Sequence, residues 1–237
     1  MNGKSTLEEM RSFYQKLDSA LAQYSCFRKD HATRPISVGG DAVYLVAEER
    51  LGSVNEIIRA CEKRFWSLLN KQAAKKVDKD AARYMGVLRP MFGDADFYLT
   101  DPENLTWVHK ALEGMGYIGN IKDVSREGCA VFSKKDAYPS KVELMANLGR
   151  GHLRPKSKKP IETILPYGEG CTTELEGLGN LAFITPQCFR QRIINDIKFE
   201  FKNGDKIPLK MLEDIVFIGA FLKEEGLSIV NGLVKSR

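Results

Sequence analysis

Two aspartates separated by one residue, Asp94 and Asp96, open an apolar stretch that continues to Leu99. Alternate side chains of a β-strand share one face, so a strand here would project both carboxylates side by side. Adjacent carboxylates repel each other, and a divalent cation such as Mg²⁺ or Mn²⁺, which prefers hard oxygen ligands, would relieve that repulsion. A third carboxylate, Glu143, interrupts the apolar stretch 142–145 and would complete a metal site if the two strands are neighbours. The alternative interpretation is a pair of solvated acids in a turn.

A pair of glycines, Gly39 and Gly40, stands between a strand-like segment over residues 36–38 and a helix-like segment over residues 41–49. A glycine turn at the start of a helix can bind a phosphate group, because backbone N–H groups point toward it and no side chain blocks the approach. Asp41 would be a good N-cap for that helix but would repel a bound phosphate. The simpler alternative is that the glycines serve only to turn the chain.

Together, these two motifs resemble the signature of minimal nucleotidyltransferases. Residues 39–45 match Gly-Gly-x-Ala-x-x-Leu and residues 94–96 match Asp-x-Asp, a pattern similar to the AbiEii-type nucleotidyltransferases of abortive-infection and toxin–antitoxin systems. The resemblance implies an α/β fold with a nucleotidyltransferase-like mixed β-sheet core and helical additions. It also implies that the glycine turn positions a triphosphate, that the Asp-x-Asp pair binds two metal ions, and that a third acid completes the site. These residues are Gly39, Gly40, Asp94, Asp96 and Glu143.

A weaker resemblance to the same family continues in the C-terminal part, so that the likeness spans roughly residues 35 to 222. Residues 184–192 resemble the family's Ser/Thr-Pro-Glu helix start with its basic residue, and residues 210–215 resemble its later Lys-Asp … Asp-Ile helix. The resemblance implies that three basic side chains also bind the nucleotide. They are Arg190, Arg192 and Lys210.

A basic segment over residues 150–159 directly follows the predicted strand that carries Glu143. A run of charges is usually a solvated surface. Basic clusters also bind phosphate backbones, and next to a metal site this segment could guide a triphosphate or an RNA end. Its candidate polyanion-binding residues are Arg150, Arg154, Lys156, Lys158 and Lys159.

The apolar spacing also predicts the elements that must position these residues. An amphipathic helix is predicted over residues 5–24 and a second long helix from Ser53, both opened by a capping-box pattern. We expect residues 1–180 to form the nucleotidyltransferase-like core, with a helical insertion near 53–85, and residues 181–237 to form a helical C-terminal region. Further predicted elements are helices from 102, 186 and 208, and strands over 129–133 and 141–145.

The composition limits the class of protein. With 237 residues, 43% of them hydrophobic and 28% charged, the chain is expected to fold around a core, which excludes disordered and collagen-like classes. The absence of any run of roughly 18 apolar residues and of a signal-peptide pattern predicts a cytoplasmic protein without a membrane partner. Its five widely spaced cysteines are expected to be reduced. A net charge of +5 favours polyanionic partners but identifies none.

The sequence therefore predicts a metal-dependent nucleotidyltransferase that moves a nucleotidyl group from a nucleoside triphosphate to an acceptor hydroxyl of RNA, protein or a small molecule. The family resemblance further implies a cognate antitoxin or regulatory protein as a partner. Two alternatives stay open. One is a catalytically inactive binding or regulatory protein that keeps the fold, and the other is a nucleic-acid-binding module that uses only the basic segment.

Overall fold

The computed structural model describes residues 3–29, 34–51, 77–78, 94–120, 129–146, 171–203 and 207–208. The chain divides into two compact units, Met1–Val43 with Met91–Ile184 and Tyr44–Pro90 with Thr185–Arg237. Several predicted features lie outside the described residues. They are the helix from Ser53, nearly all of the insertion near 53–85, the basic segment 150–159, Lys210 and the continuation of a helix beyond Pro208.

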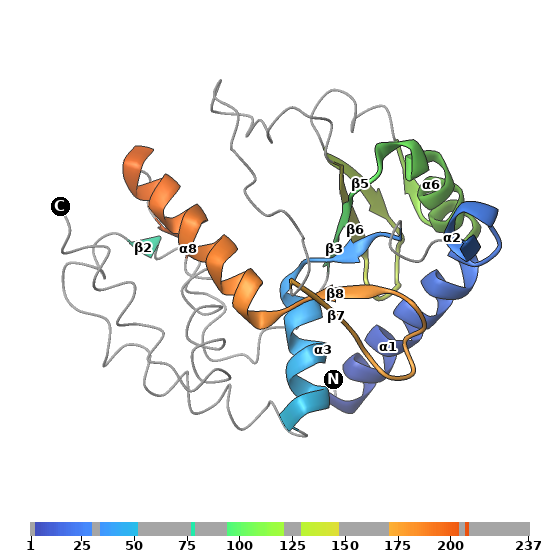
Figure 1. Cartoon of the computed structure of the whole chain (residues 1–237), viewed down its shortest axis with the longest axis horizontal. Helices are drawn as coiled ribbons and strands as arrows, with labels where there is room; N and C mark the ends of the chain where they lie inside the picture. Colours follow the sequence, from blue (N-terminus) through green and yellow to red (C-terminus); the bar gives the residue numbers. More distant parts are fainter. Residues whose placement is uncertain are drawn as a thin grey trace. The chain divides into compact units, whose positions relative to one another are not determined.

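The first unit is built on a seven-stranded mixed sheet (Figure 1). Its strands β3 and β6 are parallel neighbours, as are β1 and β8, whereas every other neighbouring pair is antiparallel. This arrangement confirms the predicted α/β class. In spatial order the strands are β4 (Ile118–Gly119), β5 (Cys129–Ser133), β6 (Lys141–Ala146), β3 (Asp94–Leu99), β1 (Ile36–Ser37), β8 (Ala182–Ile184) and β7 (Thr172–Glu174).

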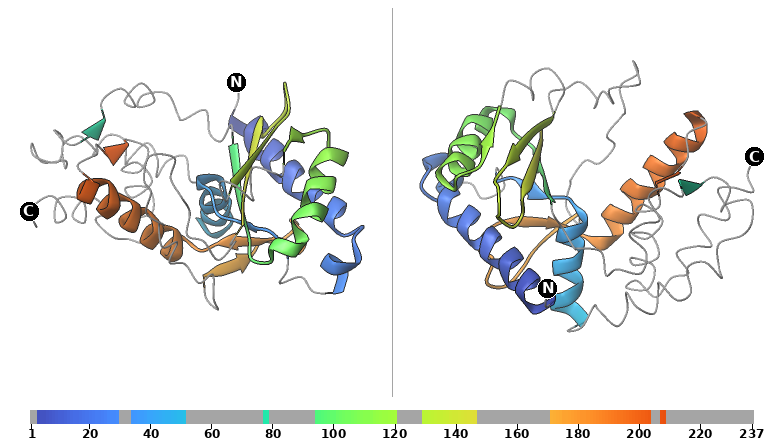
Figure 2. Two further views of the ribbon diagram at one scale, coloured as in Figure 1. Left: turned by 90° about the horizontal axis from the view of Figure 1, so that it is seen from above. Right: turned by 180° about the vertical axis from the view of Figure 1, so that it is seen from behind.

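Two helices cover one face of this sheet. Helix α1 (Gly3–Leu21) confirms the predicted amphipathic helix, and α6 (Leu105–Gly114) follows the short 3₁₀-helix η3 (Pro102–Asn104). Figure 2 shows α1 and α6 side by side, and both place aromatic rings on the sheet. The ring centroids of Phe13 and Phe97 are 6.2 Å apart, and those of His109 and Phe132 are 5.5 Å apart. The core of the first unit therefore lies between this sheet face and the two helices.

The remaining described elements are helices and a separate two-stranded sheet. Helix α2 (Ser25–Lys29) follows α1, and α3 (Gly40–Leu51) begins directly after the glycine pair. In the second unit, α8 (Pro186–Asn203) begins at the proline predicted to open a helix. Strand β2 (Val77–Asp78) pairs in parallel with β9 (Ile207–Pro208), so Pro208 itself lies in a short strand.

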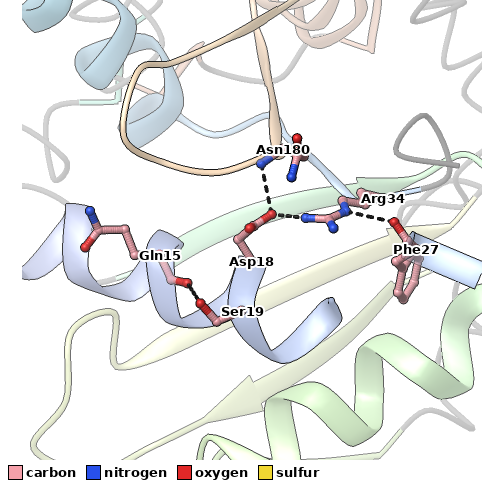
Figure 3. Close-up of polar contacts among 6 residues, drawn as sticks. All are labelled: Gln15, Asp18, Ser19, Phe27, Arg34 and Asn180. Carbon is pink, nitrogen blue, oxygen red and sulfur yellow. Dashed lines mark hydrogen bonds and ion pairs between the residues drawn. The ribbon is translucent and has the colours of Figure 1, made fainter. Parts of the chain in front are cut away.

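A buried ion pair fixes the segment that leads into β1 (Figure 3). Arg34 is 2% exposed, and its guanidinium pairs with the carboxylate of Asp18 on α1 and donates to the Phe27 carbonyl of α2 over 3.3 Å. The same Asp18 carboxylate accepts the backbone N–H of Asn180, in the turn between β7 and β8, over 3.0 Å. One carboxylate therefore connects α1 both to the segment that leads into β1 and to the turn between the edge strand β7 and its neighbour β8.

We expect Asp18→Asn to lower the free energy of unfolding by about 2–3 kcal/mol, because it leaves the Arg34 charge buried without a counter-ion. Urea unfolding at neutral pH measures this loss. Glu8→Gln is a matched control, since it removes one charge from an exposed position of the same helix. Equal stability of the two variants would show that the ion pair contributes nothing net.

Two expectations from composition can be compared with the structure. Cys171 and Cys188 are disulfide-bonded, which corrects the expectation that all cysteines are reduced, whereas Cys26 and Cys129 form no disulfide. Wide spacing along the sequence does not exclude a disulfide, because folding can bring distant cysteines together. Among the helices that the structure describes, none has both the length and the apolar character required to cross a membrane.

Candidate metal centre

The three predicted carboxylates converge on one face of the sheet. Strands β3 and β6 are in register so that Asp94 lies opposite Lys141 and Asp96 lies opposite Glu143. One carboxylate oxygen from each of Asp94, Asp96 and Glu143 lies within 4.8 Å of the other two. Asp94 is exposed and the other two are partly exposed, so an ion from solvent can reach all three. This convergence was predicted from the strand pattern, and the geometry confirms it.

Strand alternation explains why the acids share this face. Between and beyond them on β3, Ala95 and Phe97 are each 1% exposed and pack in the core. On β6, Val142 and Leu144 are fully buried in the same way. Since successive side chains of a strand point to opposite faces, burial of the apolar set forces the acids onto the other face.

The glycine turn lies directly against this acidic cluster. The N–H of Val38 donates to the Asp96 carbonyl over 2.8 Å, so the residue that follows β1 lies beside Asp96. A Cβ atom added at Gly39 would lie 2.6 Å from Asp41 Oδ1 and 3.0 Å from Asp96 Oδ2. Only glycine fits here without displacing a carboxylate. The two motifs, more than 50 positions apart in the sequence, therefore form one site.

Asp41 is buried, with 1% of its surface exposed. The hydroxyl of Tyr14 on α1 donates to its Oδ2 and also shares a 2.7 Å hydrogen bond with Ser37 Oγ. Burial raises the pKa of Asp41 to about 7; the hydrogen bond from Tyr14 opposes this rise, and the negative charge of Asp96 adds to it. No hydrogen-bond partner for Oδ1 is found among the described residues. This buried oxygen thus lies directly against the glycine turn.

Because burial and Asp96 raise the pKa of Asp41 from about 3.9 in an unfolded chain to about 7, folded protein holds this proton over a wider pH range. Between these values the folded chain binds more protons, so the Asp41 contribution makes stability fall as pH rises. We expect Asp41→Asn to gain stability relative to wild type from pH 5 to pH 8. Urea unfolding with EDTA at both pH values tests this, and an unchanged difference between the two proteins would contradict it.

Two further side chains at the cluster were not predicted. Lys141 Nζ donates to Glu143 Oε1 over 2.9 Å, and this hydrogen bond together with the Glu143 charge raises the pKa of Lys141. Burial, with the charges of Asp41 and Asp94, raises the pKa of Tyr138 well above its usual range. Lys141 could have been found from the sequence, because it precedes Glu143 by two positions and so shares its face. No sequence signal distinguishes Tyr138.

The other predicted site residues lie elsewhere in the chain. Gly40 is the first residue of α3, next to Gly39. Arg190 and Arg192 lie on α8, in the second unit. Lys210 and the five basic residues of the 150–159 segment are outside the described residues.

No protein-family model matches the chain, and neither a curated protein nor a solved structure does. The relation to nucleotidyltransferases therefore stays a prediction that rests on the sequence motifs.

Proposed function

We propose that the protein is a nucleotidyltransferase that uses Mg²⁺ or Mn²⁺ to move a nucleotidyl group from a nucleoside triphosphate to an acceptor hydroxyl. The observation that carries this proposal is the arrangement of Asp94, Asp96 and Glu143 within 4.8 Å, beside a turn that only glycine fits. Carboxylates supply the hard oxygens that these cations prefer, and backbone N–H groups at the start of a helix are a common phosphate-binding arrangement.

The residues at the cluster fit a divalent cation. Asp94, Asp96 and Glu143 would hold it, and buried Asp41 lies beside the adjoining glycine turn. Three carboxylates this close repel one another unless positive charge is supplied. When bound, the cation would neutralise charge on the triphosphate and on the departing pyrophosphate.

In the proposed reaction, the acceptor oxygen forms a bond to the α-phosphorus, and the bond from that phosphorus to the bridging oxygen breaks. Pyrophosphate leaves with the electrons of the broken bond. Glu143, which is partly exposed, takes the proton of the acceptor hydroxyl. Backbone N–H groups at Gly39 and Gly40 hold the triphosphate at the start of α3. The side chains therefore bind, orient and accept one proton.

The partners of this reaction follow from charge and from the family resemblance. Arg190, Arg192 and Lys210 are proposed to bind the nucleotide, and the basic segment 150–159 is proposed to attract a polyanionic acceptor such as RNA. A protein or small-molecule acceptor remains the alternative. A cognate antitoxin or regulatory protein is proposed on the resemblance alone.

The proposal is tested by incubating the protein with each labelled nucleoside triphosphate, Mg²⁺ and a mixture of total RNA and protein. Label attached covalently to RNA, to protein or to a small molecule supports the enzyme and identifies the acceptor class. Tight triphosphate binding without attachment would instead support the inactive-fold alternative. RNA binding that is independent of metal and triphosphate would support the nucleic-acid-binding module.

A further inference from the structure

A lysine stands among the three acids of the candidate metal centre. Lys141 lies opposite Asp94 across the β3–β6 pairing and two positions before Glu143, so all four charged side chains share one face. Its Nζ atom lies 2.9 Å from Glu143 Oε1, and the two side chains are 48% and 31% exposed. The carboxylate of Glu143 is thus both a member of the acidic cluster and the partner of an ammonium group.

An ammonium and a metal ion compete for the same carboxylate. Lys141 supplies positive charge where three carboxylates crowd within 4.8 Å, as a bound cation would. A lysine ammonium sits on a flexible four-carbon stem, so it can leave one partner for another without movement of the backbone. A cation that takes the Glu143 oxygen would therefore free the ammonium.

The surroundings limit where a freed ammonium can bind. On the β5 side of β6, the residues opposite Glu143 and Lys141 are Val131 and Ser133, neither of which carries a charge. On the β3 side lie Asp94 and Asp96, which are the proposed metal ligands. None of these register neighbours therefore offers the ammonium a new acidic partner. A phosphate brought to the same face would be its strongest acceptor.

We propose that Lys141 is the resident counter-ion of the metal-free cluster and that, when a divalent cation takes Glu143, its ammonium binds a phosphate of the nucleoside triphosphate. This inference rests on the proposed function and adds a phosphate-binding residue to it. A lysine acting as a point charge is a common phosphate ligand. The ammonium would offset one of the three carboxylate charges before the cation binds and one phosphate charge afterwards.

The test compares Lys141→Met with wild type in two binding measurements that need no turnover. Mn²⁺ binding to the protein alone is followed by electron paramagnetic resonance of the free ion. Binding of a non-hydrolysable triphosphate with Mn²⁺ present is followed by calorimetry. We expect Lys141→Met to bind Mn²⁺ about two- to fivefold more tightly, because a competitor is gone. We expect it to bind the triphosphate at least about tenfold more weakly.

Two further variants keep the result interpretable. Lys135→Met removes one positive charge from an exposed position between β5 and β6 and should leave both affinities unchanged. Lys141→Arg keeps the charge and should recover part of the triphosphate affinity. Urea unfolding should place all three variants within about 1 kcal/mol of wild type, since a partly exposed ion pair adds little stability.

The outcomes separate this inference from the proposed function. If wild type binds Mn²⁺ and Asp94→Asn weakens that binding, but Lys141→Met changes neither affinity, the role of Lys141 is overturned and the proposed function stands. Weaker triphosphate binding with unchanged Mn²⁺ affinity would overturn the exchange. If Asp94→Asn leaves Mn²⁺ binding unchanged, both proposals fail together.

Discussion

Replacing Asp96 by asparagine is expected to reduce metal-dependent nucleotidyl transfer by about a thousandfold or more. Asp96 is the central acid of the cluster, since its neighbours across the sheet and along the strand are Glu143 and Asp94. A bound metal contributes several kcal/mol to transition-state stabilisation, and each 1.36 kcal/mol corresponds to a factor of ten in rate. Transfer of label from the triphosphate at saturating Mg²⁺ measures the loss, and Mn²⁺ binding should fall in parallel.

The matched control is Glu174→Gln, which removes one carboxylate charge from an exposed position of β7 in the same sheet. This variant should retain wild-type transfer and Mn²⁺ affinity. Urea unfolding should show that Asp96→Asn is at least as stable as wild type, because it relieves repulsion between carboxylates. Full transfer activity in Asp96→Asn would remove the metal from the mechanism. Loss of activity in both variants would point to the overall charge of the protein instead.

The clustering of the three carboxylates was predictable because its sequence signal is local. The alternation of acids with Ala95 and Phe97 specifies which face they share, whatever the rest of the fold. Glu143 needed one more assumption, that β6 lies beside β3, and the structure bears it out. The family resemblance implies the same residues, and the alternation of acidic and apolar side chains indicates them independently.

The rest of the site depends on contacts that no short window of sequence contains. Tyr14 lies on the apolar stripe of α1 and has the pattern of a core residue, yet its hydroxyl reaches Asp41 on another helix. Asp41 itself was interpreted as an N-cap or as an obstacle to phosphate, whereas its carboxylate is buried. Strands β7 and β8 have three residues each, which is too short for alternation to identify them.

Gly39→Ala is expected to weaken Mn²⁺ and triphosphate binding by about a hundredfold or more and to cost about 1–3 kcal/mol of stability. The new methyl group would lie 2.6 Å from Asp41 Oδ1, and buried Asp41 cannot rotate into solvent while Tyr14 holds it. The carboxylate of Asp96, 3.0 Å from the same atom, can move, but moving it takes it away from Asp94 and Glu143. Calorimetry of Mn²⁺ and triphosphate binding, with urea unfolding, measures the three effects.

Gly114→Ala provides the control, since a methyl group added at that position of α6 would meet no atom within 4 Å. Alanine is favoured over glycine in helices by about 0.5–1 kcal/mol, so this variant should be as stable as wild type or slightly more stable. Its Mn²⁺ and triphosphate affinities should not change. If Gly39→Ala lowers stability but leaves both affinities intact, the glycine serves the fold alone. The turn would then have no part in binding phosphate. The proposed transferase would rest on the three carboxylates alone, without an identified binding site for the triphosphate.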